Sequence, residues 1–291
     1  MTDRITDANA LVDRVTELVS LPDVYLRVQQ LLADPDSSLS DIGKVISSDP
    51  GIAARLLRIA NSPFFGMASR IETISRAIGI MGTQHVHDFL LATAVTKAFS
   101  RLQNQRFDLA RFWTRSVRCA VVTRLIAIDS RVLESERLFV AGLLHDIGHL
   151  VMYQLAPDQT AEAQACAEAQ DRPPEQIERE LFFGFDYAEV GGLLLERWQL
   201  PAMLRETVMH QNEPEQANRF SFETCILHAG RMISQRMEKP GKLDDVLTRI
   251  SPTALGQTGI STDNLSSLET KTQRQLAETV ALLVPGERLA S

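Results

Sequence analysis

Apolar residues recur every three or four positions along most of this chain, with polar residues between them. Residues 11–19 give the first example, and their spacing places the apolar side chains on one face of an amphipathic helix. The first third of the chain contains no stretch in which apolar and polar residues alternate between turn residues, as they do in a half-buried strand. The pattern therefore predicts an all-α fold made of many helices.

Residues that begin helices divide this pattern into separate elements. Asp49-Pro50 is the clearest start signal, because the Asp49 side chain can accept hydrogen bonds from free amides and a proline at the first helical position loses no bond. Asp186 and Glu189 have the spacing of a capping box ahead of another apolar run. Further capping residues are expected at Ser40, Thr73, Asp108, Ser135 and Ser221.

The C-terminal part of the chain changes in composition. Residues 239–267 are richer in Gly, Pro, Ser and Thr, which is typical of a loop or a loosely packed connection. Residues 268–284 return to helical periodicity and predict a final amphipathic helix. No internal repeat is visible that would indicate a solenoid.

The stretch LFVAGLLHDIGHL, residues 138–150, places three polar side chains in an apolar run. If these residues form one helix, His145 and His149 lie on the face that packs against the rest of the protein. Buried imidazoles and the neighbouring Asp146 must find hydrogen-bond partners in the core or bind a ligand such as a metal ion. A nitrogen and an oxygen from one helical turn suit the divalent ions of hydrolases.

Composition restricts the class of protein. Of the 291 residues, 44% are hydrophobic and 23% are charged, which is typical of a soluble globular protein. A net charge of −7 and a pI near 5.5 argue against nucleic acid and membrane surfaces as general partners. The three cysteines, Cys119, Cys166 and Cys225, are too far apart for a disulfide framework or a thiolate zinc site. The N-terminal residues lack an apolar signal segment and no later stretch is expected to span a membrane, so the expected location is the cytoplasm.

The phrase GLLHDIGHL resembles the helix that gives the HD superfamily of metal-dependent phosphohydrolases its name. A longer series of motifs, over residues 18–211, resembles the HDOD domain, an HD-related output domain of bacterial signalling proteins. These motifs are Leu21-Pro22, Asp49-Pro50, LLRIANS at 56–62, Phe112-Trp113, GLLHDIG at 142–148, Glu180, Gly184-Phe185, Glu189-Val190-Gly191, Trp198, Leu200-Pro201 and His210.

The resemblance implies a fold and a division of the chain. It implies a multi-helix HD-like bundle preceded by an N-terminal helical subdomain. We expect residues 1–106 to form the N-terminal helical part, residues 107–238 the HD-like part, and residues 239–291 a C-terminal loop and helix extension.

The resemblance also implies a set of metal ligands, and this chain departs from it at several positions. Arg115 stands where active HD proteins have a histidine before the HD pair, and Tyr187 stands where larger relatives have another. His210 is present but is followed by Gln211, where a second histidine would be expected. Gly230 stands where the terminal aspartate would be.

The remaining ligand candidates are His145, Asp146, His210 and, if the geometry is altered, His149. A guanidinium cannot coordinate a metal and would repel one, so Arg115 is expected to pair with Asp146 or to form an anion site. We therefore expect no catalytic residues, a residual HD motif at His145 and Asp146, and no cofactor.

Two functions follow from these expectations. The first is a non-catalytic signal-transduction or regulatory protein that binds a sensor kinase, a response regulator or a cyclic-dinucleotide enzyme. The alternative is an atypical metal-dependent phosphohydrolase that uses Mn, Fe or Mg on a nucleotide or cyclic dinucleotide. A small-molecule sensor with an anion bound beside Arg115 is a third hypothesis, between these two.

Overall fold

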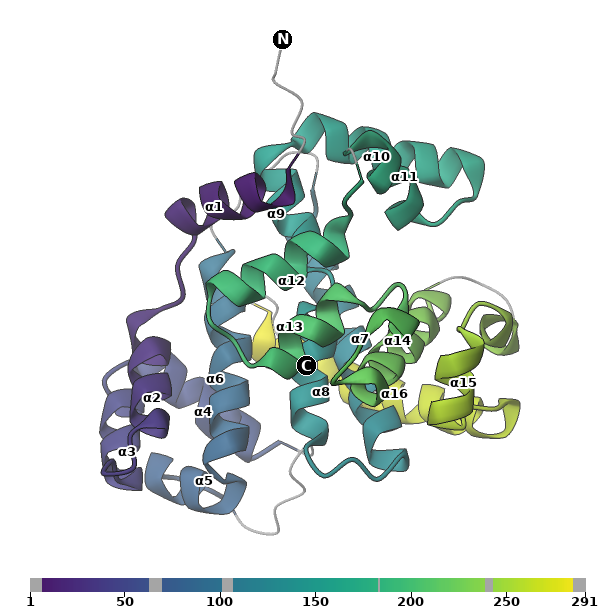
Figure 1. Cartoon of the computed structure of the whole chain (residues 1–291). Coiled ribbons are helices and arrows are strands. Elements are labelled where there is room, and N and C mark those ends of the chain that lie inside the picture. Colours follow the sequence, from purple (N-terminus) through teal and green to yellow (C-terminus); the bar gives the residue numbers. More distant parts are fainter. Residues whose placement is uncertain (1–6, 63–69, 101–106, 183, 239–242, 285–291) are drawn as a thin grey trace. The chain divides into compact units, whose positions relative to one another are not determined.

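The structure is a computed structural model that describes residues 7–62, 70–100, 107–182, 184–238 and 243–284. These residues form helices joined by turns and contain no strand (Figure 1). The prediction of an all-α fold is therefore confirmed.

The chain divides into two compact units, each made of two segments. Unit 2 comprises Leu21–Arg101 and Gln273–Ser291. Within unit 2, α2 packs against α3 and α6, and α5 packs against α3, α4 and α6. The helices of its first segment are α2 (Asp23–Ala33), α3 (Leu39–Ser47), α4 (Pro50–Ala60), α5 (Ile74–Met81) and α6 (Thr83–Ala98).

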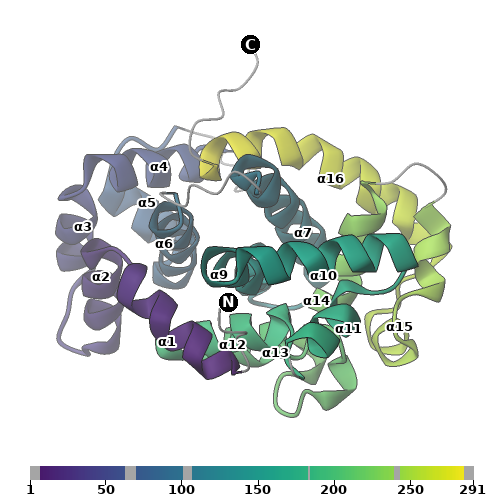
Figure 2. The ribbon, with the colours of Figure 1, turned by 90° about the horizontal axis from the view of Figure 1, so that it is seen from above.

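Unit 1 comprises Met1–Ser20 and Leu102–Thr272. Within unit 1, α7, α8 and α14 pack on one another. The helix α12 packs against α1, α9 and α13 (Figure 2). The helices of unit 1 before residue 252 are α1 (Ala8–Leu18), α7 (Leu109–Asp129), α8 (Ser135–Leu144), α9 (Ile147–Leu155), α10 (Pro157–Gln170), α11 (Pro174–Leu181), α12 (Tyr187–Arg197), α13 (Ala202–Met209), η1 (Pro214–Gln216), α14 (Ser221–Arg236) and η2 (Leu243–Thr248).

The expected division at 106/107 and 238/239 is linear, whereas each unit combines segments that are distant in sequence. Residues 101–106 and 239–242, which adjoin both expected boundaries, lie outside the described residues. The helix α16 (Thr262–Leu283) belongs to unit 1 up to Thr272 and to unit 2 from Gln273 onward.

Helix starts follow the sequence signals in part. Asp49 accepts hydrogen bonds from the amides of Gly51 and Ile52, and Thr73 and Asp108 cap their helices as expected. The start expected at Ser40 is wrong, because Ser38 caps α3 two residues earlier in a capping box with Asp41. Asp186 caps α12, without a recorded return bond from Glu189. The helices α8 and α14 begin at Ser135 and Ser221, which are first helical residues and not caps.

The loop expected over residues 239–267 is also wrong where the structure describes it. That segment contains η2, α15 (Pro252–Thr258) and the beginning of α16. The hydroxyl of Ser251 caps α15, with Pro252 at the first helical position. The Gly, Pro and Ser content of this region therefore reflects short helices with many ends.

The central apolar stretch is two helices instead of one. The helix α8 ends at Leu144, α9 begins at Ile147, and the HD pair forms the turn between them. Together they cover Ser135–Leu155, the one described stretch that is long and apolar enough to cross a membrane, contrary to expectation. However, 83% of its most apolar window is buried inside the protein, as in the core helices of soluble proteins.

Glycines allow the backbone of this region to pack closely on its neighbours. A Cβ atom on Gly148 would lie 1.9 Å from the carbonyl oxygen of Tyr187, and one on Gly142 would lie 2.6 Å from the Cα of Ala120. No side chain fits at such distances. These two contacts hold the turn that carries the HD pair between α7 and α12.

Candidate functional site

His145 is buried and held by the backbone of its own helix. Its Nδ1 lies 2.7 Å from the carbonyl oxygen of Gly142, to which it donates, and the residue is 5% exposed. Burial lowers the pKa of His145 to about 4, although Asp146 opposes this shift. The imidazole is therefore neutral at pH 7. Donation from one ring nitrogen to a backbone carbonyl is also how metal-ligating histidines are commonly oriented.

Asp146 belongs to a chain of three side chains that His149 connects. The Nδ1 of His149 lies 2.5 Å from a carboxylate oxygen of Asp146, and its Nε2 lies 2.6 Å from one of Glu178 on α11. The backbone amide of Tyr187 donates to the other oxygen of Glu178 at 3.0 Å. The ring of Tyr187 stacks on His149 with centroids 4.2 Å apart. His149 thus has protein partners for both nitrogens and for one ring face.

The two carboxylates set the charge of His149. Burial opposes the charged imidazolium, but Asp146 and Glu178 outweigh burial and raise the pKa of His149 to about 10. Burial likewise opposes the charged form of Asp146, but His149, His145 and Arg115 together hold the pKa of this carboxyl below its ordinary value. At pH 7 the cluster is therefore an internal imidazolium between two carboxylates.

Arg115 does not pair directly with Asp146, and this prediction from the sequence is wrong. The Nε of Arg115 lies 3.4 Å from a carboxylate oxygen of Glu238, which also binds Arg118. The side chain of Arg115 is 37% exposed, so its charge is well solvated. An anion bound at Arg115 would have to compete with Glu238, and the expected anion site stays a prediction.

Arg231 is a second cation near the HD pair, and the sequence reasoning missed it. It is only 2% exposed, and its nearest recorded carboxylate is that of Glu175, 4.0 Å from Nη2. Its Nε and Nη2 have no hydrogen-bond partner in the part of the chain that the structure describes. Burial opposes its charge, but Tyr187, Glu175 and, more weakly, Asp146 raise its pKa above the ordinary value.

Arg231 could have been noticed from the sequence, because it directly follows Gly230, the position where the resemblance implies a ligand aspartate. The structure leaves no room for a side chain at Gly230. A Cβ on Gly230 would lie 2.2 Å from the hydroxyl oxygen of Thr123 and 3.0 Å from its Cα. An aspartate at 230 would therefore force α14 away from α7.

Gln211 also contributes to the structure around the pair. Its side-chain amide donates to the carbonyl oxygens of His145, at 2.6 Å, and Val208, at 2.9 Å. The Nδ1 of His228 donates to the carbonyl of Gln211 at 2.8 Å, and the amide of Ser251 donates to Nε2 of His228 at 3.1 Å. Gln211 thus fixes the backbone of the HD turn.

The structure does not bring His210 to the other candidates. His210 ends α13, and its recorded side-chain interaction is electrostatic, with Glu206. No contact recorded for the described residues joins it to His145, Asp146 or His149. The predicted ligand set is therefore not assembled.

These residues do not fit a divalent metal ion. Within the described ranges, no group of three or more His, Cys, Asp and Glu side chains could hold one. His149 has no free nitrogen, and its imidazolium with Arg231 already supplies positive charge beside Asp146. A divalent ion that used His149 or the bonded oxygen of Asp146 would have to displace these bonds, and both cations would repel it.

Comparisons with known proteins agree with this fold. A candidate phosphohydrolase of Shewanella amazonensis SB2B is 29% identical, with a TM-score of 0.73 over 94% of this chain and 98% of that one. An HDOD domain protein of unknown function from Geobacter sulfurreducens is 21% identical, with a TM-score of 0.72 over 95% and 97%.

A relative in sequence is an uncharacterised protein of Treponema pallidum (strain Nichols). It is 27% identical over 210 residues, which are 71% of this chain, and this chain spans about 40% of its length. The HDOD domain family model matches residues 18–214, which is more than half of the chain. The chain therefore belongs to the HDOD domain family, and its fold is that of the HD superfamily.

Proposed function

We propose that this protein is a non-catalytic HDOD signal-transduction protein that acts through protein–protein interaction. The observation that carries the proposal is the Asp146–His149–Glu178 chain, in which the side chains nearest the HD motif satisfy one another. The close packing at Gly230 supports the proposal, because Thr123 of the neighbouring helix fills the space that the side chain of a ligand aspartate would need.

A metal ion and His149 would compete for the same oxygen of Asp146. An ion that coordinated this oxygen would displace the imidazolium of His149, which would then remain part-buried beside Glu178 with one partner fewer. Breaking a buried ion pair in this way costs about 3–5 kcal/mol, and the arriving ion would also meet the charge of Arg231. The HD turn therefore serves as an internal structural cluster in a protein whose output is binding.

An atypical phosphohydrolase is the alternative, and two observations favour it. The Shewanella amazonensis protein with 29% identity is described as a candidate phosphohydrolase. The orientation of His145, with Nδ1 on a backbone carbonyl, also matches that of a ligating histidine. Such an enzyme would use Mn, Fe or Mg on a nucleotide or cyclic dinucleotide.

Elemental analysis separates the two functions. We expect protein purified without chelator to carry much less than one Mn, Fe or Zn per chain, and a chelator to leave the melting temperature unchanged, because a bound ion would stabilise the native state. With Mn²⁺, Fe²⁺ or Mg²⁺ added, hydrolysis of a phosphodiester probe should equal that of an Asp146→Asn variant. Near-stoichiometric metal lost together with stability, or hydrolysis that depends on Asp146, would establish the enzyme instead.

The partner that we propose is another bacterial signalling protein, such as a sensor kinase, a response regulator or a cyclic-dinucleotide enzyme, met in the cytoplasm. The net charge of −7 supports a protein partner over nucleic acid or an anionic membrane. The family supports a role in signalling because HDOD domains are output domains.

A further inference from the structure

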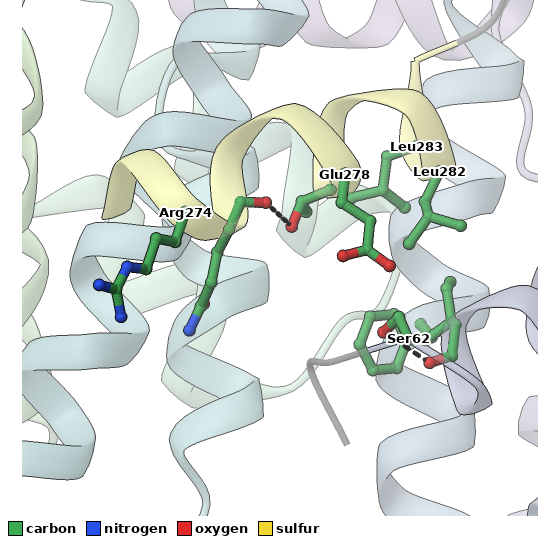
Figure 3. A pocket seen from close by; sticks show the side chains of 9 residues that line it. Ser62, Arg274, Glu278, Leu282 and Leu283 are labelled. Carbon is green, nitrogen blue, oxygen red and sulfur yellow. Dashed lines mark hydrogen bonds between the residues drawn. The ribbon is translucent and has the colours of Figure 1, made fainter. Parts of the chain in front are cut away.

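Unit 2 contains a cavity of about 210 Å³ beneath the second half of α16 (Figure 3). All of its recorded lining residues belong to this unit, so the cavity is a feature of unit 2 alone. The end of α4, one side of α6 and the last turns of α16 supply an apolar wall. The apolar lining residues are Ile59, Phe89, Leu282 and Leu283.

The polar part of the lining includes two side chains with acceptor oxygens that no described donor contacts, those of Gln275 and Glu278. Glu278 lines the cavity, and no hydrogen bond or ion pair joins its carboxylate to any described residue. Arg274 lies one helical turn away, a spacing at which opposite charges commonly pair, yet the two do not pair. Figure 3 shows Glu278 directed from α16 toward the side where Ser62 lies, with Arg274 farther along the helix.

A second acceptor lies on the same helix. The side-chain oxygen of Gln275 is buried and has no hydrogen-bond partner among the described residues. Buried acceptors in a protein nearly always have a donor, and an unsatisfied one destabilises the folded state. A buried amide oxygen and a half-buried carboxylate on one wall, facing an apolar wall, point to a ligand that brings hydrogen-bond donors.

We propose that this cavity binds a small organic cation, an amine that carries an apolar body. The ammonium group would donate to the carboxylate of Glu278 and to the amide oxygen of Gln275, while the apolar body would contact Phe89 and Leu282. The volume is below the range of about 300–1,000 Å³ that is usual for drug-sized ligands, so the ligand is the size of a single ring or a short chain.

The proposal goes beyond binding to a protein partner, because it assigns a chemical input to unit 2. The ligand would contact α4, α6 and the second half of α16 at once. Binding would therefore stabilise the packing of that half of α16 within unit 2.

Calorimetric titration with phenethylamine and with phenylacetate, which have the same ring and opposite charges, tests the proposal on the unaltered protein. We expect saturable binding of the amine and none of the carboxylate. Glu278→Gln should weaken binding of the amine by about tenfold or more, because a charge-assisted hydrogen bond is lost. Glu72→Gln removes the same charge from an exposed site of unit 2 outside the cavity and should bind like the parent.

A second variant tests where the amine binds without changing the charge of the cavity. Leu282→Trp would fill the cavity and should abolish binding of the amine, and circular dichroism melts would verify that each variant is folded. Equal binding of the amine by the parent and by Glu278→Gln would overturn the proposal. So would preference for phenylacetate, or no binding of the amine to the parent at millimolar concentration.

Discussion

Two histidines four residues apart in the same motif have different protonation states at pH 7 in this structure. His145 is neutral because burial lowers its pKa to about 4, whereas Asp146 and Glu178 raise the pKa of His149 to about 10 against the effect of burial. The sequence identified both residues as candidates and could not distinguish them. The difference depends on Glu178, which is distant in sequence and reaches His149 only after α9 and α11 fold.

This assignment predicts how stability depends on pH. The folded pKa of His149 lies above the unfolded value of about 6.5, so its protonation stabilises the fold fully below pH 6.5, and this contribution is lost as pH rises toward 10. In Glu178→Gln one of the two carboxylates is gone and the folded pKa of His149 is lower, so the alkaline loss of melting temperature, which begins near pH 6.5 in both proteins, should be smaller in the variant and should end at a lower pH. Glu180→Gln, which neutralises an exposed carboxylate on the same helix, should follow the parent.

NMR titration of the His149 ring measures its pKa directly. Its midpoint should lie above pH 8 in the parent and should fall in Glu178→Gln. The acid side offers an internal control, since His145 and His228 have pKa values lowered to about 4. Their stabilising effect is present above pH 6.5 and is lost as pH falls toward 4, and this acid limb should be alike in both proteins. A His149 midpoint that Glu178→Gln does not move would contradict the cluster.

At the scale of elements, the sequence predicted what local chemistry determines and failed where tertiary contacts decide. The starts at Asp49, Thr73 and Asp108 were correct because a cap needs only its own first turn. The break between α8 and α9 was not predicted, because apolar periodicity continues through it and the turn is held by Gln211, which follows α13 and is distant in sequence. The sequence showed that Arg115 and Gly230 stand at positions of family metal ligands. It did not show that Arg115 pairs with Glu238 or that Thr123 packs against Gly230.

Glycine contacts give a prediction for these helices. Gly148→Ala places a methyl group 1.9 Å from the carbonyl oxygen of Tyr187, so α9 and α12 must separate. We expect a loss of about 1–3 kcal/mol or more in the free energy of unfolding. Gly79→Ala is the matched control, since it lies within α5 and a Cβ there would meet nothing within 4 Å. It should raise stability by up to about 1 kcal/mol through helix propensity, and urea denaturation would measure both.

If both substitutions raised stability by the same amount, helix propensity, and not the α9–α12 contact, would control the outcome. Destabilisation by Gly79→Ala alone would show that the HD turn is less closely packed than the structure indicates. The expected order, with Gly148→Ala well below the parent and Gly79→Ala at or above it, ties the glycine of the HD motif to packing.

At the scale of the whole molecule, the proposed function requires the fold of unit 1 but does not require the metal-dependent hydrolysis of HD enzymes. A protein that signals by binding needs unit 1 to be folded and does not need His145 or His210 as ligands. We therefore expect the His145→Ala/His210→Ala double variant, where it is present at normal abundance, to complement a deletion strain. The enzymatic alternative requires the opposite result, because the variant removes two of the candidate ligands while leaving Asp146 and His149 in place.

Abundance must be measured with the phenotype, since losing a buried imidazole that donates to Gly142 lowers stability and can imitate a loss of function. Gly148→Ala supplies the control, because it destabilises unit 1 through packing and leaves every candidate ligand intact. If the double variant and Gly148→Ala, compared at matched abundance, both complement, then signalling depends on the folded scaffold. Loss of the phenotype in the double variant alone, together with loss of a measurable phosphodiesterase activity, would show that the HD turn still performs chemistry.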